Sequence, residues 1–238
     1  METLDRRDLV KSAAMAAAAT IFVGAATDAN AQTQSAPGKA ATYQIKPLPF
    51  DPKSIKGLSE KILTSHHDNN YAGAVRRLNA ISTQFAALDV ASAPVFTING
   101  LKREELIAMN SMILHELYFD GLGAGGAPSG DLAQILARDF GSVERWRAEF
   151  SAMGKAEGGG SGWVLLAWSP HDKRLVNQWA ADHTHGIAGG RPILALDMYE
   201  HAYHMDYGAG AAGYVDAYMQ AINWNSVSSL FDKYSRQV

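Results

Sequence analysis

The chain has 238 residues, a formal net charge of −3 and no cysteine. Without cysteine there can be no disulfide and no thiolate metal site, so any metal must be held by nitrogen and oxygen ligands, which suit iron, manganese or zinc. The near balance of 21 basic and 24 acidic residues indicates neither a nucleic-acid partner nor an anionic membrane surface as partner.

Residues 1–31 have the pattern of an export signal, which is removed from the mature protein. Arg6 and Arg7 precede an alanine-rich apolar run, and Ala29-Asn30-Ala31 is a small-x-small cleavage pattern. The arginine pair is typical of the twin-arginine route and predicts a periplasmic protein. A membrane anchor is the less favoured alternative, because the run is shorter than the ~20 residues of a spanning helix. Residues 32–42 are small and polar and predict a disordered linker.

The next part of the chain predicts an N-terminal helical-hairpin domain over residues 43–126. The prolines of 43–53 predict an extended segment. Apolar residues at helical spacing predict a long helix over 56–86. After a break with a proline at 91–100, a second helix is predicted over 102–121, ended by a glycine-rich loop.

Residues 127–238 predict a C-terminal α/β domain. Short helices are expected near 130–138 and 142–156. Strand-like runs follow at 163–168, 174–179 and 192–196. The first two are expected to pair as a hairpin, and helices resume near Tyr199. The fold class predicted is therefore α+β, with a helical hairpin followed by a small three-stranded antiparallel sheet and surrounding helices.

Two histidines and one Asp-x-x-x-His segment are the candidate metal ligands. His66 lies mid-way along the first predicted helix and His115 late in the second. If these helices pack antiparallel, both imidazoles can point into one seam. Asp197 and His201 lie at the end of a predicted strand, on adjacent sides of one turn. This spacing alone is weak evidence, because it recurs by chance. A second histidine pair, His183-Thr-His185, is predicted to lie in a solvated loop.

The segment Asp197-Met-Tyr-Glu-His-Ala-Tyr203 resembles the Asp-Val-Trp-Glu-His-Ala-Tyr signature of iron/manganese superoxide dismutases. The resemblance runs from about residue 43 to the end of the chain and is most specific over 160–224. Further landmarks of that family occur in the same order: Pro47-Leu-Pro-Phe50, Phe140-Gly141-Ser142, Gly160-Ser-Gly-Trp163, Asn177-Gln178 and Asn223-Trp224.

The resemblance implies metal-dependent dismutation of superoxide anion to dioxygen and hydrogen peroxide. It implies one manganese or iron ion per chain, held by His66, His115, Asp197 and His201. The choice of His66 over His67 depends on counting back from Leu78-Asn79, and a shift of one residue stays open.

The resemblance also assigns roles around the metal. Gln178 is expected to hydrogen-bond the solvent ligand, and together with the small Ser111 it favours manganese. His204, where the family has a tyrosine, is expected to be a proton donor, since an ordinary histidine titrates near neutrality. Glu200, beside His201, is expected to bridge a homodimer by binding the partner's metal-ligating histidine.

The sequence departs from the family pattern around the predicted metal. Asn70 and Ala74 stand where the family has a gate histidine and a gate tyrosine, and Ala211 where it has a guiding arginine. Loss of that arginine is expected to slow anion capture. A metal-binding homologue with weak or no dismutase activity is therefore the alternative. A hydrolase with a zinc-bound water is a third reading. The native metal, the rate and the choice between dimer and tetramer stay open.

Overall fold

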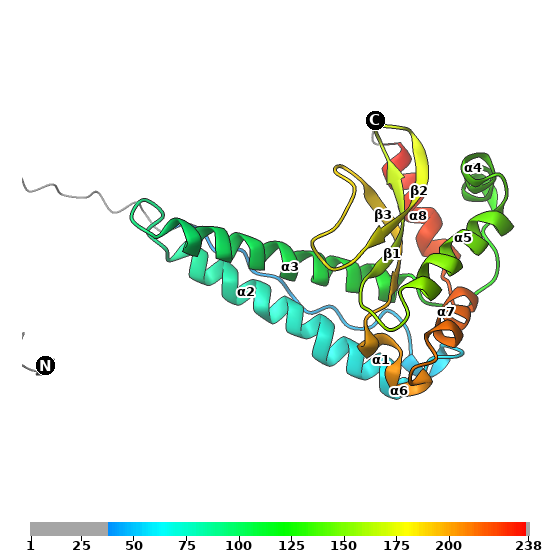
Figure 1. The fold of residues 1–238 in the computed structure, drawn as a ribbon, viewed down its shortest axis with the longest axis horizontal. Helices are drawn as coiled ribbons and strands as arrows, with labels where there is room; N and C mark the ends of the chain where they lie inside the picture. The colour runs from blue at the N-terminus through cyan, green and yellow to red at the C-terminus, as the bar shows by residue number, and fades with distance from the viewer. Residues whose placement is uncertain (1–37, 237–238) are drawn as a thin grey trace, which may run out of the picture. The chain divides into compact units, whose positions relative to one another are not determined.

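The computed structural model describes residues 38–236. The predicted signal, residues 1–31, lies outside the described residues, as does the first part of the predicted linker. The described residues belong to one compact unit, Ser35–Val238, and the domain boundary after residue 126 stays a prediction. The fold is α+β, with a helical hairpin, a three-stranded antiparallel sheet and surrounding helices (Figure 1).

The first long helix begins at Glu60 and contains a change of helix type. It consists of α1 (Glu60–Ser65), the π-helical segment η3 (His66–Tyr71) and α2 (Ala72–Ala86). The side chain of Ser59 caps its start by accepting a hydrogen bond from the backbone of Ile62. The helix therefore begins four residues after the start predicted for it at residue 56. The α-helical spacing predicted for its residues was wrong within η3.

Helix α3 (Val95–Asp120) packs beside α2 to complete the hairpin (Figure 1). It begins seven residues before the predicted start, directly after Pro94, which lies at the N-cap. A proline is tolerated at a helix start because the first backbone N–H groups have no helical partner. The exposed side chains of Val95 and Phe96 break the amphipathic pattern, which is why the sequence did not indicate these first turns.

The described part of the predicted linker, residues 38–42, is bound to α2. Ala41 donates its backbone N–H to Ser82 Oγ at 2.7 Å. Tyr43 follows with a bond from its N–H to Asn79 Oδ1, also at 2.7 Å. These bonds fix an extended segment along the helix, so for these residues the expected disorder was wrong.

The sheet has the strand order β2-β1-β3 and is antiparallel throughout. Its strands are β1 (Trp163–Ser169), β2 (Arg174–Ala180) and β3 (Arg191–Asp197). Every residue of β1 is buried, because the central strand is covered on both faces. The register places Trp163 opposite Asp197, which brings the end of β3 next to the start of β1.

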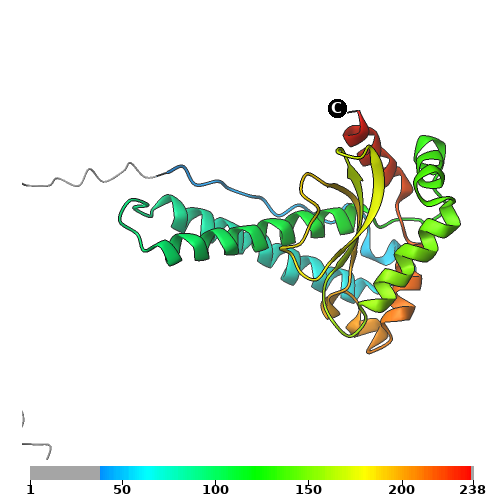
Figure 2. The ribbon, with the colours of Figure 1, turned by 45° about the horizontal axis from the view of Figure 1, so that its top comes forward.

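Helices enclose this sheet, as Figure 2 shows from a second side. Helix α3 contacts β3, whereas α4, α5 and α8 contact the strands from the other side. Among residues 38–236, no helix is long and apolar enough to cross a membrane. The remaining elements are η2 (Pro52–Ser54), α4 (Gly130–Phe140), α5 (Val143–Ala156), η4 (Glu200–Ala202), α6 (His204–Tyr207), α7 (Ala211–Gln220) and α8 (Trp224–Ser235).

Candidate metal centre

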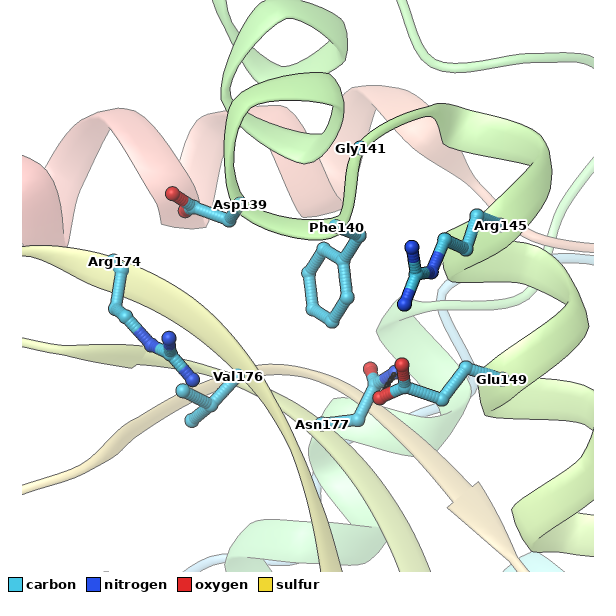
Figure 3. Close-up of a pocket in the computed structure, with 8 residues that line it drawn as sticks. All are labelled: Asp139, Phe140, Gly141, Arg145, Glu149, Arg174, Val176 and Asn177. Carbon is cyan, nitrogen blue, oxygen red and sulfur yellow. Dashed lines mark hydrogen bonds between the residues drawn. The ribbon is translucent and has the colours of Figure 1, made fainter.

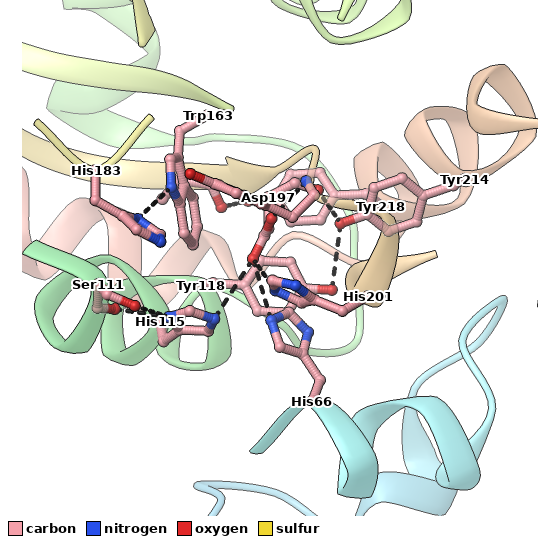
Figure 4. A network of polar contacts seen from close by, with 12 residues as sticks. His66, Ser111, His115, Tyr118, Trp163, His183, Asp197, His201, Tyr214 and Tyr218 are labelled. Atoms are coloured by element: carbon pink, nitrogen blue, oxygen red, sulfur yellow. Dashed lines mark hydrogen bonds and ion pairs between the residues drawn. The ribbon is translucent and has the colours of Figure 1, made fainter. Parts of the chain in front are cut away.

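Four side chains from four separate elements converge at one point (Figure 4). They are His66 of η3, His115 of α3, Asp197 at the end of β3 and His201 of η4, and their ligand atoms all lie within 4.8 Å of one another. Asp197 Oδ2 lies 3.1 Å from His66 Nε2, 3.3 Å from His201 Nε2 and 3.6 Å from His115 Nε2. We call these four residues the cluster.

The π-helical segment begins with two adjacent histidines, and one of them reaches the cluster. His66 is buried, with 1% of its surface exposed. The neighbouring His67 is directed away, and its Nε2 lies 2.8 Å from the carbonyl oxygen of Lys46. His66 therefore joins the cluster and His67 does not, which favours His66 of the two candidate ligands.

The hydrogen bonds of His115 leave one nitrogen free to bind a cation. Its Nδ1 donates to the backbone carbonyl of Ser111 at 2.6 Å, which places the ring proton on Nδ1. Nε2 is consequently an acceptor, and it is buried without a hydrogen-bond partner. A buried nitrogen in this state is unfavourable unless a ligand satisfies it, and a metal ion would do so.

The two carboxylate oxygens of Asp197 have different partners. Its Oδ1 accepts the backbone N–H of Tyr199 at 2.8 Å, which orients the group, while Oδ2 meets the imidazoles. Burial by itself would raise the pKa of Asp197, but His201 and His66 hold that pKa well below its ordinary value. The carboxylate is therefore ionised.

Burial lowers the pKa of both fully enclosed imidazoles. The pKa of His66 is lowered, and that of His115 is lowered to about 3, because the charged form loses its solvation. The three imidazoles and the ionised carboxylate together supply three nitrogen donors and one anionic oxygen. This donor set fits a divalent or trivalent ion such as iron, manganese or zinc.

Aromatic side chains surround the cluster and keep most water away. The ring of His66 contacts Tyr118 at 4.9 Å and Phe119 at 5.1 Å between centroids. Tyr199 stacks on His201 at 5.4 Å. His201 is the most open of the four ligands, with 26% of its side chain exposed. The site is therefore enclosed around His66, His115 and Asp197 and reachable from solvent near His201.

His183 is the functional candidate that sequence reasoning missed. Its ring lies 6.2 Å from that of His115 and stacks on Tyr199 at 4.9 Å. Trp163 donates its indole N–H to His183 Nδ1 at 3.0 Å (Figure 4). Half-buried against these rings, His183 is not the solvated residue expected. His183 lies three residues after Ala180, which pairs with Trp163, and this register is known only from the structure.

The structure does not bring Gln178 to the cluster. This glutamine lies buried on β2, opposite Leu165 of the central strand. Among the described residues, its amide makes no hydrogen bond to any ligand of the cluster, and His183 lies beside His115. Its expected hydrogen bond to a solvent ligand stays without support from this geometry.

His204 also lies apart from the cluster. The chain turns through η4, and at Tyr203 the backbone adopts φ −143° and ψ −24°. This turn buries Tyr203, which stacks on Tyr214 at 5.3 Å, and leaves His204 exposed at the start of α6. The expectation that His204 donates protons at the metal therefore has no support from its position, whereas Glu200 is exposed beside His201.

A separate surface pocket of about 380 Å³ lies between the α4–α5 turn and β2 (Figure 3). Its carboxylates already have partners within the chain. Asp139 accepts from Arg138 and from the backbone of Leu175, and Glu149 accepts from Asn177. None of the residues that line this pocket belongs to the cluster.

Comparisons with known proteins agree with this arrangement. Residues 128–230 match the family model described as iron/manganese superoxide dismutases, C-terminal domain. The chain is 67% identical over 189 residues to a protein named superoxide dismutase [Fe] from Cupriavidus metallidurans, covering 79% of this chain and 96% of that relative.

More distant relatives include both metal types. The chain is 35% identical over 195 residues to superoxide dismutase [Mn] 1 of Halobacterium salinarum, covering 80% of this chain and 96% of the relative. It is 32% identical over 197 residues to superoxide dismutase [Fe] of Methanothermobacter thermautotrophicus, covering 80% of this chain and 95% of the relative. With these identities extending over nearly the whole of each relative, the chain belongs to the iron/manganese superoxide dismutase family.

Proposed function

We propose that this chain catalyses the dismutation of superoxide with one iron or manganese ion held by His66, His115, Asp197 and His201. The observation that carries the proposal is the convergence of these four ligand atoms within 4.8 Å, with a buried nitrogen that lacks a partner. The relative from Cupriavidus metallidurans is named for iron, so iron is the first metal to test.

The chain's own residues set the charge and the proton positions of the site. A bound ion would alternate between its +3 and +2 states, oxidising one superoxide to dioxygen and reducing a second, which takes up two protons to form hydrogen peroxide. The single carboxylate of Asp197 leaves the site positive in both states, which favours entry of a small anion.

His183 is the residue that we assign to proton handling beside the metal. Because its Nδ1 accepts the indole N–H of Trp163, the proton of the neutral ring lies on Nε2. Burial lowers the pKa of His183, so this neutral form prevails at neutral pH. A donor N–H is thereby held close to His115.

Elemental analysis of the purified protein, together with a superoxide assay, tests the proposal. We expect about one iron or manganese per chain and rapid superoxide consumption. Asp197→Asn should remove the anionic ligand and abolish both metal retention and activity, whereas Asp172→Asn, at an exposed turn, should change neither. Full metal content and activity in Asp197→Asn would contradict the assignment.

A metal-binding homologue with weak dismutation is the second candidate. It is favoured by Asn70, Ala74 and Ala211, which replace the gate and guiding residues that the family resemblance leads one to expect. The two candidates differ in rate and not in metal content. A stoichiometrically loaded protein whose superoxide consumption does not exceed that of free metal ion would support the second.

We also propose a homodimer in which Glu200 binds the partner's metal-ligating histidine. Support comes from the exposure of Glu200 and the partly exposed side chain of His201. Analytical ultracentrifugation should give a dimer for the wild type and a weakened dimer for Glu200→Ala. A wild-type protein that sediments as a monomer at micromolar concentration would exclude this arrangement.

Export through the twin-arginine route is the proposal for residues 1–31, and it places the mature protein in the periplasm. The sequence pattern around Arg6 and Arg7 is its support. In cells, the wild type should fractionate with the periplasm in a shortened form. Replacing both arginines by lysine should retain the full-length chain in the cytoplasm, and unchanged export of that variant would refute the route.

A further inference from the structure

A cleft of about 300 Å³ lies between the η3–α2 helix and α3 and ends beside the cluster. At its inner end, Ser111 Oγ lies 3.3 Å from His115 Nδ1, and the ring of His183 lies 6.2 Å from that of His115. The cleft therefore stops one side chain away from a metal ligand. Its lining residues are Asn69, Asn70, Gly73, Ala74, Arg77, Ile107, Ala108, Ser111 and His183.

Most side chains that line this cleft are small or uncharged, so the cleft is open and few charges act on an ion inside it. Gly73 and Ala74 carry little or no side chain, so the space above Ser111 is left unfilled. Arg77 is the sole permanent cation among the lining residues, and no carboxylate lines the cleft. An anion inside it consequently meets one positive group and no negative one.

Arg77 is held at the mouth by a carboxylate of the neighbouring helix. Its guanidinium donates to Glu104 of α3, and 58% of the arginine side chain is exposed. Glu104 also accepts from Arg103 at 3.5 Å. These three side chains together carry a net charge of +1, so the mouth stays positive although Arg77 is paired.

The position where the family resemblance places a guiding arginine is apolar in this chain. Ala211 begins α7 and is buried, and Gly158, two residues after α5, lies so close that a Cβ added to it would meet the Cβ of Ala211 at 3.0 Å. No cation can act from there. A positive group that attracts the substrate must therefore come from another element, and among the residues that line this cleft Arg77 is the permanent cation.

We propose, on the basis of the function assigned above, that Arg77 draws superoxide into this cleft and that Glu104 limits how much of its charge is available. Arg77 follows His66 by eleven residues, which corresponds to roughly 16 Å along the helix axis. That separation exceeds the screening length of about 8 Å at physiological ionic strength but lies within the ~30 Å found at 0.01 M salt. At low salt the charge of Arg77 therefore reaches an anion along the cleft and favours its binding, while Arg77 takes no part in the chemistry at the metal.

Charge substitutions at the mouth test the proposal through two independent readouts. In iron-loaded protein, the affinity for azide is measured by absorption titration and the kcat/KM for superoxide by pulse radiolysis. Arg77→Gln should weaken azide binding and lower kcat/KM by about two- to fivefold at low salt, the effect of one charge a few ångströms from the path of the anion. Both differences should vanish at high salt, and kcat should not change.

Glu104→Gln provides the opposite change at the same place. Freed from its carboxylate, Arg77 should strengthen azide binding and raise kcat/KM by a similar factor. Arg145→Gln, an exposed arginine of α5 outside the cleft, changes the net charge by the same amount and should leave both readouts at the wild-type value.

A steric substitution tests whether the anion uses this passage. Gly73 has ordinary backbone torsion, and a Cβ there would meet only the end of Arg76 at 4.0 Å, so Gly73→Leu can place a side chain in the cleft without a clash at its Cβ. The association rate of azide should fall at all salt concentrations. Gly100→Leu in α3, with no atom within 4 Å of its Cβ position, is the matched control.

Unchanged azide affinity and kcat/KM in both Arg77→Gln and Glu104→Gln would overturn the proposal. So would an unchanged azide association rate in Gly73→Leu, since the anion would then enter beside the exposed face of His201. These results leave the proposed function intact, because that function fails only if the metal-loaded wild type does not consume superoxide.

Discussion

At the scale of single residues, the least expected group is Glu157, at the end of α5. Both of its carboxylate oxygens are buried without a hydrogen-bond partner, and its Oε2 lies against the backbone of Gly162. Burial and the nearby charge of Asp197 raise the pKa of Glu157 to about 7. A carboxyl group in this state favours the folded protein when protonated and opposes folding when ionised.

The sign of this effect gives a pH-dependent prediction. Because the folded pKa lies above the unfolded value of 4.5, stability is lost as the pH rises from about 4.5 through 7. Glu157→Gln removes this loss, and we expect a gain of about 1 kcal/mol at pH 7.5 after allowance for partial exposure. Thermal unfolding should show the gain at pH 7.5 and almost none at pH 4.5. A gain of equal size at both values would contradict the ionisation argument.

His183 shows why only some of the residues at the site could be predicted from the sequence. The four cluster residues could be named because the resemblance carried them, although spacing alone did not single them out. His183 belongs to a loop whose path is set by the pairing of β1 with β2, and by the indole of Trp163 to which it is bonded. Nothing in the local sequence reports such a distant partner, so the amide of Gln178 was predicted in its place.

At the scale of elements, the π-helical segment determines the ligand geometry. His66 and Tyr71 are five residues apart, and both have 1% of their surface exposed. In a uniform α-helix these side chains would point about 140° apart around the axis, whereas the wider turn of η3 brings them to one side. Tyr71 then donates its hydroxyl to Glu116, the neighbour of His115 on α3.

Removing one residue from this segment should break the site while sparing the helix. Deletion of the exposed Asn69 returns η3 to α spacing, and His66 then rotates by about 100° relative to α2. We expect metal content to fall to near zero with helicity retained in circular dichroism. Asn69→Ala keeps the chain length and should retain the metal. Full metal content in the deletion variant would show that the wider turn has no role in the ligand geometry.

The elements themselves were largely predictable, and the exceptions have physical causes. The strands and α4 and α5 followed from apolar runs, turn residues and caps such as Ser142, which accepts from Arg145. A π turn leaves no compositional mark, because it changes a hydrogen-bonding step and not the residue types. The early start of α3 was hidden by exposed apolar side chains at Val95 and Phe96.

At the scale of the whole molecule, the cluster links parts of the chain that are far apart in sequence. His66 and Asp197 are separated by 131 residues, and the four ligands come from η3, α3, β3 and η4. A bound ion therefore ties the helical hairpin to the sheet. Without it, ionised Asp197 and the unpartnered nitrogen of His115 remain enclosed at the junction, which opposes folding.

Metal removal should therefore loosen these elements together. After chelation we expect a lower melting temperature. We also expect faster amide hydrogen exchange in η3, the second half of α3 and the β3–η4 junction, because the ion is their shared contact. The α4–α5 turn, which has no ligand, serves as the internal control. Exchange that rises at one ligand segment alone would show that the ion does not couple the hairpin to the sheet.

The wide sequence separation of the ligands also fixes when the metal can be acquired. The last two ligands, Asp197 and His201, leave the ribosome after most of the chain has been made, and the site needs the register that places Trp163 opposite Asp197. A nascent chain thus presents no complete site until its final strand has joined the sheet. We therefore expect the ion to be taken from the metal pool present where the sheet is completed.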